Sequence, residues 1–173
     1  LRDMTPGSEG VFGIIADACV HIHEVPEKKE YRACFFQDFD SGVKATRLLL
    51  QHEVQTAMVR LSDANETFFY SVMHGGAEVA ENGPVGFCLM LVGFEGAGDE
   101  VAHQRSRAEA ILSQCGGADM GGSMGQLWLT TRFDTPYLRD PMLDHGLGVD
   151  TVETATDWNR LPDLHTNVNT VLE

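Results

Sequence analysis

The distribution of apolar and polar positions predicts alternating strands and helices through the middle of the chain. Residues 31–36 are rich in aromatic side chains and predict a strand. From Phe39 to about Glu53 the apolar positions recur near helical spacing, and Asp38 stands where it can cap this helix. Residues 57–61 form a short apolar run, which predicts a second strand.

The next stretch repeats this alternation with a longer polar break. Residues 63–70 predict a helix, and the glycines and the proline between His74 and Gly86 predict a long loop. Residues 87–94 are almost all apolar, as in a central strand that is buried on both faces. Residues 99–115 predict a long helix, because two glycines follow directly and glycine favours the left-handed conformation that ends many helices.

The two ends of the chain give weaker patterns. Residues 15–22 carry alternating apolar positions and predict a strand that ends before Pro26. Toward the other end, residues 120–146 predict an irregular segment, residues 149–154 a last strand, and the chain from Asp163 onward a helix.

The order of these elements predicts the fold class. Through the middle of the chain it is strand, helix, strand, strand, helix, strand, with the segment at 149–154 as the last strand. This order predicts a ferredoxin-like α+β fold, in which an antiparallel sheet carries both helices on one face. The irregular residues 120–146 are then additional to the core, and irregular segments are where functional sites tend to lie.

Charge and composition narrow the class of protein. The chain has 173 residues, and 12 basic against 26 acidic residues give a formal net charge of -14, which would repel a nucleic-acid backbone. The hydrophobic fraction is 43%, with no apolar run near the roughly 18 residues of a membrane-spanning helix, so we expect a globular domain without a membrane span. The four cysteines lack CxxC or zinc spacing, which favours free thiols in a reducing cytoplasm.

A glycine-rich segment and an arginine between two prolines are candidate anion-binding features. Residues 7–13 contain three glycines that would let backbone amides approach a ligand, although a plain turn explains the same residues. Arg139 lies between Pro136 and Pro141, so a stiff backbone could hold its guanidinium as a fixed fork for a carboxylate or a phosphate. The alternative is an ion pair with a neighbouring aspartate.

Three other candidates each have a plainer explanation. Arg60 lies on a predicted apolar strand and needs either a salt-bridge partner or a ligand. Glu153 could orient an arginine or simply face solvent. His21 and His23 share one face of a predicted strand, but without a third ligand in the sequence we expect exposed histidines and no metal site. Serine and cysteine patterns typical of hydrolases are absent.

Three segments together carry a family resemblance: PGSEGVFGIIADACVHIHEVPE, AMVRLSD and FDTPYLRDPMLDHGLGVDTVETATDW. They resemble the FAD-linked oxidases of the vanillyl-alcohol oxidase type, most closely the branch related to alkyldihydroxyacetonephosphate synthase. The resemblance spans nearly the whole chain in order. It implies that residues 1–27 end an FAD-binding domain, with a loop and a strand, and that residues 28–173 form a ferredoxin-like substrate or cap domain.

The resemblance also implies roles for particular residues. Arg139 matches an arginine at the flavin and substrate face, and Arg60 matches a second functional arginine. Glu153 and Thr154 match an acidic residue and a threonine on the strand that leads back toward the site. The residues that match the end of the loop contacting FAD are Glu9, Gly10, Val11, Phe12, Gly13, Ile14 and Ile15.

Relative to the family, we expect both ends of the chain to be cuts. The main FAD-binding half would precede Leu1, and an acid/base tyrosine with a histidine-rich segment would follow Glu173. The implied partners are that FAD-binding half of the same polypeptide and a small anionic substrate, and a homodimer is compatible with this interpretation. This chain alone should bind FAD weakly or not at all, since the half that buries the cofactor is missing.

Three functions remain open at this point. The first is an FAD-dependent oxidase or dehydrogenase in which Arg139 orients an anionic substrate for hydride transfer. The second is a synthase-type transferase, in which a fatty alcohol displaces the acyl chain of an acylated dihydroxyacetone phosphate. The synthase has a lysine where this chain has Glu9, whereas oxidase and dehydrogenase relatives commonly carry PGSEG, which favours the first. The third is a noncatalytic ligand-binding or assembly module.

Overall fold

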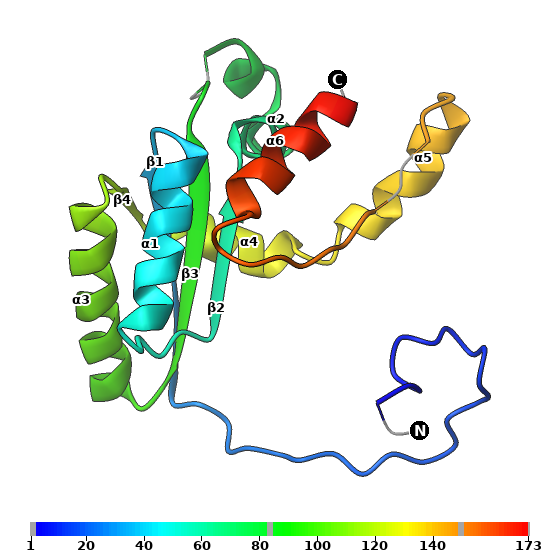
Figure 1. Ribbon diagram of the computed structural model, residues 1–173, viewed down its shortest axis with the longest axis horizontal. Coiled ribbons are helices and arrows are strands. Elements are labelled where there is room, and N and C mark those ends of the chain that lie inside the picture. The colour runs from blue at the N-terminus through cyan, green and yellow to red at the C-terminus, as the bar shows by residue number, and fades with distance from the viewer. Residues whose placement is uncertain (1–2, 83–84, 149–150, 173) are drawn as a thin grey trace.

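A four-stranded antiparallel sheet forms the centre of the protein (Figure 1). The structure is a computed structural model and describes residues 3–82, 85–148 and 151–172. The strands are β1 (Lys28–Phe36), β2 (Met58–Ser62), β3 (Cys88–Gly96) and β4 (Ala118–Gly121), in the spatial order β2-β3-β1-β4. This order is that of a ferredoxin-like fold, so the predicted α+β class is confirmed.

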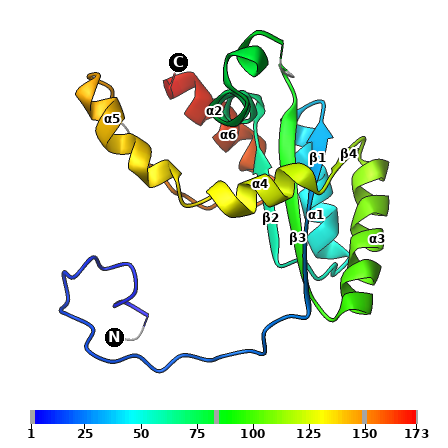
Figure 2. The same ribbon diagram turned by 180° about the vertical axis from the view of Figure 1, so that it is seen from behind.

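The helices follow the strands along the chain. Their bounds are α1 (Phe39–Gln51), α2 (Ala64–Asn82), α3 (Gly98–Gln114), α4 (Ser123–Thr131), the short 3-10 turn η1 (Thr135–Leu138), α5 (Arg139–Asp144) and α6 (Leu161–Leu172). Helices α1 and α3 lie side by side on one face of the sheet, and α4 crosses the opposite face (Figures 1 and 2). We call residues 28–121, which contain the sheet and helices α1, α2 and α3, the body.

The central strand β3 is buried on both faces, as its unbroken apolar run predicts. It pairs with β1 over the full register from Lys28 opposite Gly96 to Phe36 opposite Cys88, and with β2 from Met58 to Ser62. Because side chains alternate along a strand, one set of β3 residues faces α1 and α3 while the other set faces α2 and α4.

The larger core lies between the sheet and the pair α1 and α3. Asp38 caps α1 by accepting a hydrogen bond from the Ser41 backbone N–H at 2.7 Å, as its position in the sequence predicts. The capped helix turns its apolar face to the sheet. The buried residues of this core are Cys34, Phe36, Ala45, Leu49, Val54, Cys88, Met90, Val92, Phe94, Val101, Ala108 and Leu112.

The predicted pair of helices, α1 and α3, lies on one face of the sheet, and further helices cover the second face. Ala33, Leu89 and Leu91 pack there against residues of α2 and α4, including Tyr70 and Trp128. The buried Thr67 hydroxyl of α2 accepts a hydrogen bond from the Leu89 backbone N–H at 2.9 Å. Helices beyond the ferredoxin-like pair therefore bury the side of the sheet that a bare antiparallel fold would leave to solvent.

Two segments project from the body on the side of the β2 edge (Figures 1 and 2). The tail, residues 3–27, runs away from β1 and ends in a loop. The arm, residues 133–148, continues from α4 through η1 and α5. The return segment, residues 151–160, then leads back to α6, which stands on the face that carries α1. Among the described residues, no helix combines the length and the apolar character that a membrane crossing requires.

Several predicted boundaries are wrong. Residues 15–22 are not a strand, and the fourth strand is β4, not residues 149–154; of the latter, 151–154 lack regular structure and 149–150 lie outside the described residues. The predicted loop from residue 74 is helical as far as Asn82. Helix α2 continues through the two glycines that were expected to lie in a loop. The segment expected to be irregular, residues 120–146, contains α4, η1 and α5.

Candidate functional site

The loop at the end of the tail is a series of tight turns that open to solvent. Backbone N–H groups of Ser8, Val11 and Gly13 donate to carbonyl groups three residues earlier, at 2.9 to 3.2 Å. The loop glycines have positive φ values, and nothing lies within 4 Å of the place where a side chain would stand on them. This backbone conformation favours glycine and leaves an open approach to the loop, as a ligand-contacting turn requires.

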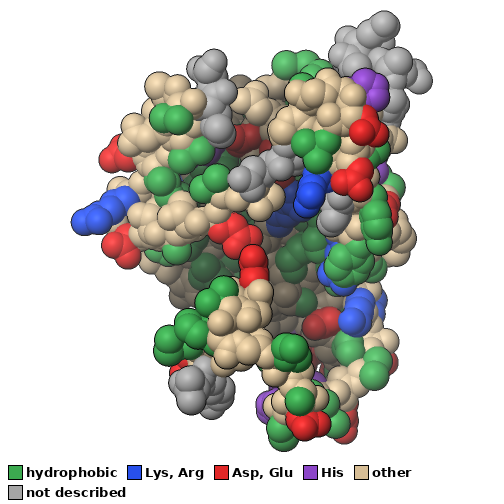
Figure 3. Space-filling model, turned by 90° about the vertical axis from the view of Figure 1, so that its right-hand side faces the viewer, with side chains coloured by type: hydrophobic (Ala, Val, Ile, Leu, Met, Phe, Trp, Pro, Cys, Tyr) green, Lys and Arg blue, Asp and Glu red, His purple; other side chains and the backbone are tan. Residues whose placement is uncertain are grey.

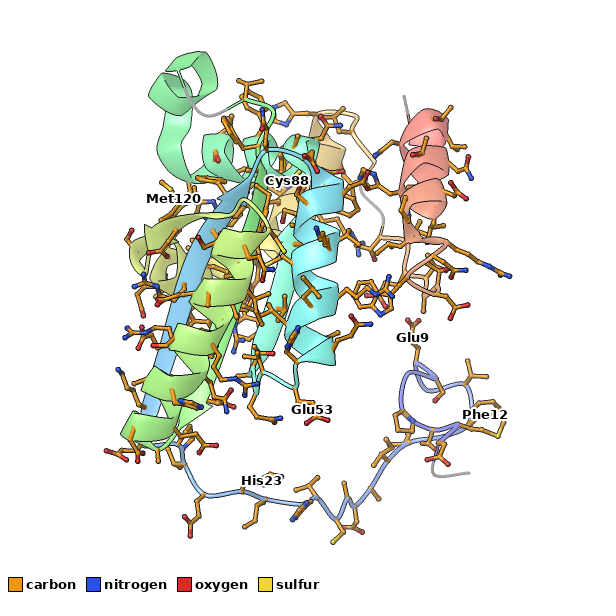
Figure 4. All side chains as sticks on the ribbon, turned by 60° about the vertical axis from the view of Figure 1, so that its left-hand side comes forward. Glu9, Phe12, His23, Glu53, Cys88 and Met120 are labelled. Carbon is orange, nitrogen blue, oxygen red and sulfur yellow. The ribbon has the colours of Figure 1, made fainter. Side chains whose placement is uncertain are left out.

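The residues that resemble an FAD-contacting stretch, Glu9 to Ile15, are all exposed in this chain. Figure 4 shows Glu9 and Phe12 on the loop, well away from the body, and His23 on the extended stretch that leads to it. Ile14 is 98% exposed, so its apolar side chain contacts almost nothing within the chain.

The apolar alternation at residues 15–22 does not produce a strand, because in the described structure these residues pair with no neighbouring strand. An isolated extended segment has no hydrogen-bonding partner to hold it as part of a sheet. The His21 and His23 rings lie 4.4 Å apart on this segment, and the described residues include no group of three His, Cys, Asp or Glu side chains placed to hold a metal.

Arg139 is the first residue of α5 and lies on the arm. Its side chain is 68% exposed, and its Nε is 4.0 Å from an Asp140 carboxylate oxygen that is itself 90% exposed. Exposed ion pairs of this kind contribute little, because water screens both charges. The arm therefore presents the guanidinium to the surroundings, and the expected ion pair with a neighbouring aspartate is present only as a loose one.

The Arg60 side chain already has an ion-pair partner within the chain. It lies on the edge strand β2, and its guanidinium forms a hydrogen-bonded ion pair with the Glu66 carboxylate at the start of α2. Both side chains are about half exposed. The structural salt bridge, one of the two explanations that the sequence left open for Arg60, is thus what the structure contains.

Glu153 and Thr154 lie in the return segment and are exposed. They do not lie on the predicted strand, because residues 151–157 have no strand structure, and the neighbouring Val152 is 92% exposed. The return segment connects the arm that carries Arg139 to α6.

The predicted site residues thus lie at four places and are not gathered into one pocket. The tail loop and the arm project from the same side of the molecule, on which the sheet ends with strand β2 and its Arg60 (Figures 1 and 2). Figure 3 views this side directly and shows hydrophobic side chains on the surface among acidic and basic ones. A surface of this kind suits contact with another protein domain.

A cationic contact and a polar cluster in the structure were not predicted from the sequence. The guanidinium of Arg132 lies over the Trp128 ring at 5.4 Å and the Phe133 ring at 4.5 Å, at the joint between α4 and the arm. Near the start of α2, Asp63 and His165 come within hydrogen-bond distance. Only Asp63 has a sequence signal, since Asp63 followed by Glu66 is typical of a helix start.

Two cavities lie away from Arg139, one within the body and one between the body and α6. One, of about 330 Å³, is lined by apolar core residues and by Arg32, Cys34, Glu109 and Asp119. Its arginine is neutralised by Asp119 and Glu109. The other, of about 280 Å³, surrounds the cluster of Asp63 and His165. Burial, together with the Asp119 charge, raises the pKa of the Cys34 thiol to about 12, so this thiol stays protonated and unreactive.

A comparison with known protein families gives the class of protein to which this fold belongs. The family described as FAD linked oxidases, C-terminal domain, matches residues 25–173. The chain therefore belongs to this family, whose cofactor is FAD.

Individual relatives point to one branch. Alkyldihydroxyacetonephosphate synthase from Dictyostelium discoideum is 32% identical over 174 residues, which cover 91% of this chain and 28% of that protein. The enzyme of the same name from Trypanosoma brucei brucei is 28% identical over 171 residues, covering 90% of this chain and 28% of that protein. The chain thus spans little more than a quarter of the length of these curated relatives.

Solved structures give the same branch. Two crystal forms of alkyldihydroxyacetonephosphate synthase, each 30% identical to this chain, superpose with TM-scores of 0.78 and 0.77. The matches cover 99% and 95% of this chain, and 36% and 33% of those chains. The resemblance inferred from the sequence, to FAD-linked oxidases of the synthase-like branch, is confirmed.

Proposed function

We propose that this chain is the substrate-covering part of an FAD-dependent oxidoreductase and that it positions an anionic substrate over the flavin. The observation that carries the proposal is an exposed Arg139 on the arm of a domain that belongs to the FAD-linked oxidase family. We also propose that residues 1–27 complete an FAD-binding domain and that residues 28–173 form the cap. The start of the family match at residue 25 and of β1 at Lys28 support this boundary.

The tail loop fits one edge of an FAD site. Its positive-φ glycines leave open space where a side chain would otherwise block a ligand, and its carbonyl-bonded turns fix the backbone. The exposed apolar residues of the tail fit the interior of a neighbouring domain. We therefore propose that residues 9–15 contact FAD together with a partner, the FAD-binding half of the same polypeptide.

Arg139 is proposed to bind the anionic group of the substrate. A guanidinium offers a planar fork that matches a carboxylate or a phosphate, and the loose pair with Asp140 leaves this fork available. Glu153 and Thr154 are proposed to face the same substrate from the return segment. Arg60 is the least available of these candidates, because Glu66 already neutralises its charge.

When bound, FAD supplies the redox chemistry by accepting a hydride from the substrate. The residues of this chain bind and orient the substrate, so that its reacting carbon faces the flavin, and they cover the reaction from water. The net charge of -14 does not prevent anion binding, because an arginine governs the potential close to it.

A second candidate function is a synthase-type transfer. The curated and structural relatives described above are all named alkyldihydroxyacetonephosphate synthase, which favours this reaction. Here Arg139 would bind the phosphate of the substrate in place of a carboxylate. Two assays on the full-length protein separate the reactions: alkyl product from acyl-dihydroxyacetone phosphate and a fatty alcohol, or oxidation of a panel of 2-hydroxy acids.

The test of the proposed function compares two arginine variants of the full-length protein. We expect the purified protein to show a flavin absorption spectrum and Arg139→Ala to keep this spectrum. Turnover with the accepted substrate should fall about 30-fold or more, the effect of losing one partner of a desolvated, hydrogen-bonded charge pair. Arg139→Lys should recover only part of the loss, because an ammonium lacks the planar fork.

The matched control is Arg47→Ala, which removes an exposed arginine from α1 and should leave turnover unchanged. A colourless full-length protein, or full turnover in Arg139→Ala, would contradict the proposal and favour a noncatalytic ligand-binding or assembly module. We further propose a cytoplasmic location, supported by four free cysteines, and a homodimer as the assembly to examine by light scattering.

A further inference from the structure

Helix α6 meets the body at a small polar cluster around His165. The His165 ring stacks on the Phe39 ring of α1, with ring centroids 3.9 Å apart and planes 13° from parallel. The His165 Nε2 atom lies 3.0 Å from Asp63 Oδ2 at the start of α2. One side chain of α6 thus contacts two different elements of the structure.

A second hydrogen bond, to the other carboxylate oxygen, holds the Asp63 side chain in position. Its Oδ1 accepts a hydrogen bond from the Glu66 backbone N–H at 2.8 Å and so caps α2. Burial raises the pKa of Asp63, but the hydrogen bonds from the Glu66 backbone and from His165 outweigh this, and the net pKa is lowered. Asp63 is therefore a carboxylate at neutral pH, with one oxygen on α2 and the other on α6.

The Nε2 atom of His165 has a second neighbour within α6 itself. Asn169, one turn later, places its Nδ2 atom 3.0 Å from the same ring nitrogen. One nitrogen either donates or accepts: with a proton it donates to Asp63, and without one it accepts from Asn169. A charged ring always carries a proton on Nε2 and so bonds α6 to the body, whereas a neutral ring can instead accept from Asn169 inside α6.

Acidic side chains and a thiol line the cavity beside the His165 ring. Asp38 and the Cys88 thiol line the same cavity of about 280 Å³ as Asp63 and His165, and its described lining includes no lysine or arginine. Burial, followed by the charges of Asp63 and Asp38, raises the pKa of Cys88 to about 11, so its thiol is neutral. The two carboxylates attract an imidazolium, and the parallel Phe39 ring adds a cation–π contact.

We infer that His165 is a positioning residue, which clamps α6 to the body and so fixes one end of the return segment that carries Glu153 and Thr154. The other end of that segment follows the arm with Arg139 (Figure 1). A positive charge on the ring adds a Coulomb attraction to the Asp63 carboxylate, so the clamp tightens when the ring gains a proton. The relevance to substrate binding rests on the proposed function, whereas the clamp itself does not.

Paired spin labels measure the clamp directly in the full chain. The labels are placed at Gln51→Cys on α1 and Thr156→Cys in the return segment, after Cys19→Ser and Cys115→Ser remove accessible thiols. Histidine side chains change charge between about pH 5 and 8. We expect a narrow distribution of label distances at about pH 5.5 and a broader one at about pH 8. Amide exchange in α6 should speed up several-fold over the same interval, after correction for intrinsic rates.

Two variants should abolish this response. His165→Gln cannot gain a charge, and Asp63→Asn still caps α2 but no longer attracts an imidazolium, so both should show the broad distribution at either pH. His103→Gln on α3, an exposed histidine, should respond like the unaltered protein. Equal widths at both pH values, or a narrow distribution in either clamp variant, would overturn the inference. No substrate or turnover enters this measurement, so its result is independent of Arg139.

Discussion

The body and the tail contain the same kinds of apolar residues and use them in opposite ways. In the body, Phe36 and Phe94 are fully buried between the sheet and its helices. In the tail, the exposed fractions of Ile14, Val20 and Ile22 are 98%, 72% and 80%. The sequence pattern is similar in both regions, so the pattern alone does not decide burial. Burial requires a partner surface, and the tail lacks one within the described chain.

This difference explains where the candidate site lies. Residues whose positions are set by packing within the chain, such as those of β3, form the body and carry no proposed role. The proposed functional residues lie on the tail, the edge strand, the arm and the return segment, where packing is least. A surface that a second domain completes would have this organisation.

A cavity made in the body should give the largest difference in unfolding free energy between the body and the tail. Phe36→Ala removes a fully buried ring, and we expect the free energy of unfolding to fall by about 3–5 kcal/mol. Ile14→Ala in the tail should change it by less than about 0.5 kcal/mol, because this side chain is 98% exposed. Urea unfolding followed by circular dichroism measures both. A comparable loss in the two variants would show that the tail packs against the body.

The joint between the body and the arm gives the next largest effect. A Cβ on Gly125 of α4 would lie 2.7 Å from Tyr31 Cβ and 2.8 Å from its carbonyl carbon, so the helix must move away from β1. We expect Gly125→Ala to destabilise the protein by about 1–3 kcal/mol. Gly148→Ala at the end of the arm meets nothing within 4 Å and is the matched control. Equal unfolding midpoints for the two variants would contradict this packing.

The fold could be predicted from the sequence where local signals and burial agree. The apolar run of β3, the cap at Asp38 and the glycines after α3 each identify an element within a few residues. The fourth strand could not, since Ala118–Gly121 is only four residues long, lacks β-branched or aromatic residues, and becomes a strand only by pairing with β1. The clamp at His165 joins residues about a hundred positions apart, and no local pattern records such a contact.

Buried and exposed thiols should affect stability at alkaline pH differently. Burial raises the pKa of Cys34 to about 12, above the value of an unfolded thiol. The unfolded chain therefore releases this proton first, so stability is complete below about pH 8.5 and is lost as the pH rises toward 12. Between pH 9 and 10 we expect a loss of about 1 kcal/mol from this thiol.

Cys34→Ala should reduce this alkaline loss without removing it, because the pKa of the buried Cys88 is also raised, to about 11. Cys19→Ser in the exposed tail should leave the alkaline loss as it is. Unfolding midpoints measured at pH 8, 9 and 10 test all three proteins. An unchanged alkaline slope in Cys34→Ala would mean that this thiol is not buried in solution.

The smallest expected effect distinguishes the two candidate arginines. Arg60 and Glu66 form a hydrogen-bonded pair between β2 and α2, whereas Arg139 and Asp140 are neighbours on the arm at 4.0 Å. A double-mutant cycle with alanine at each position should give a coupling of about 0.2–1 kcal/mol for the first pair and none for the second. Because a guanidinium already coupled to a carboxylate must lose that partner before it binds an anion, coupling at Arg60 alone would leave Arg139 as the free cation. Equal couplings would remove this distinction, and Arg139 on the arm would then be no more available for substrate binding than Arg60 at the edge of the sheet.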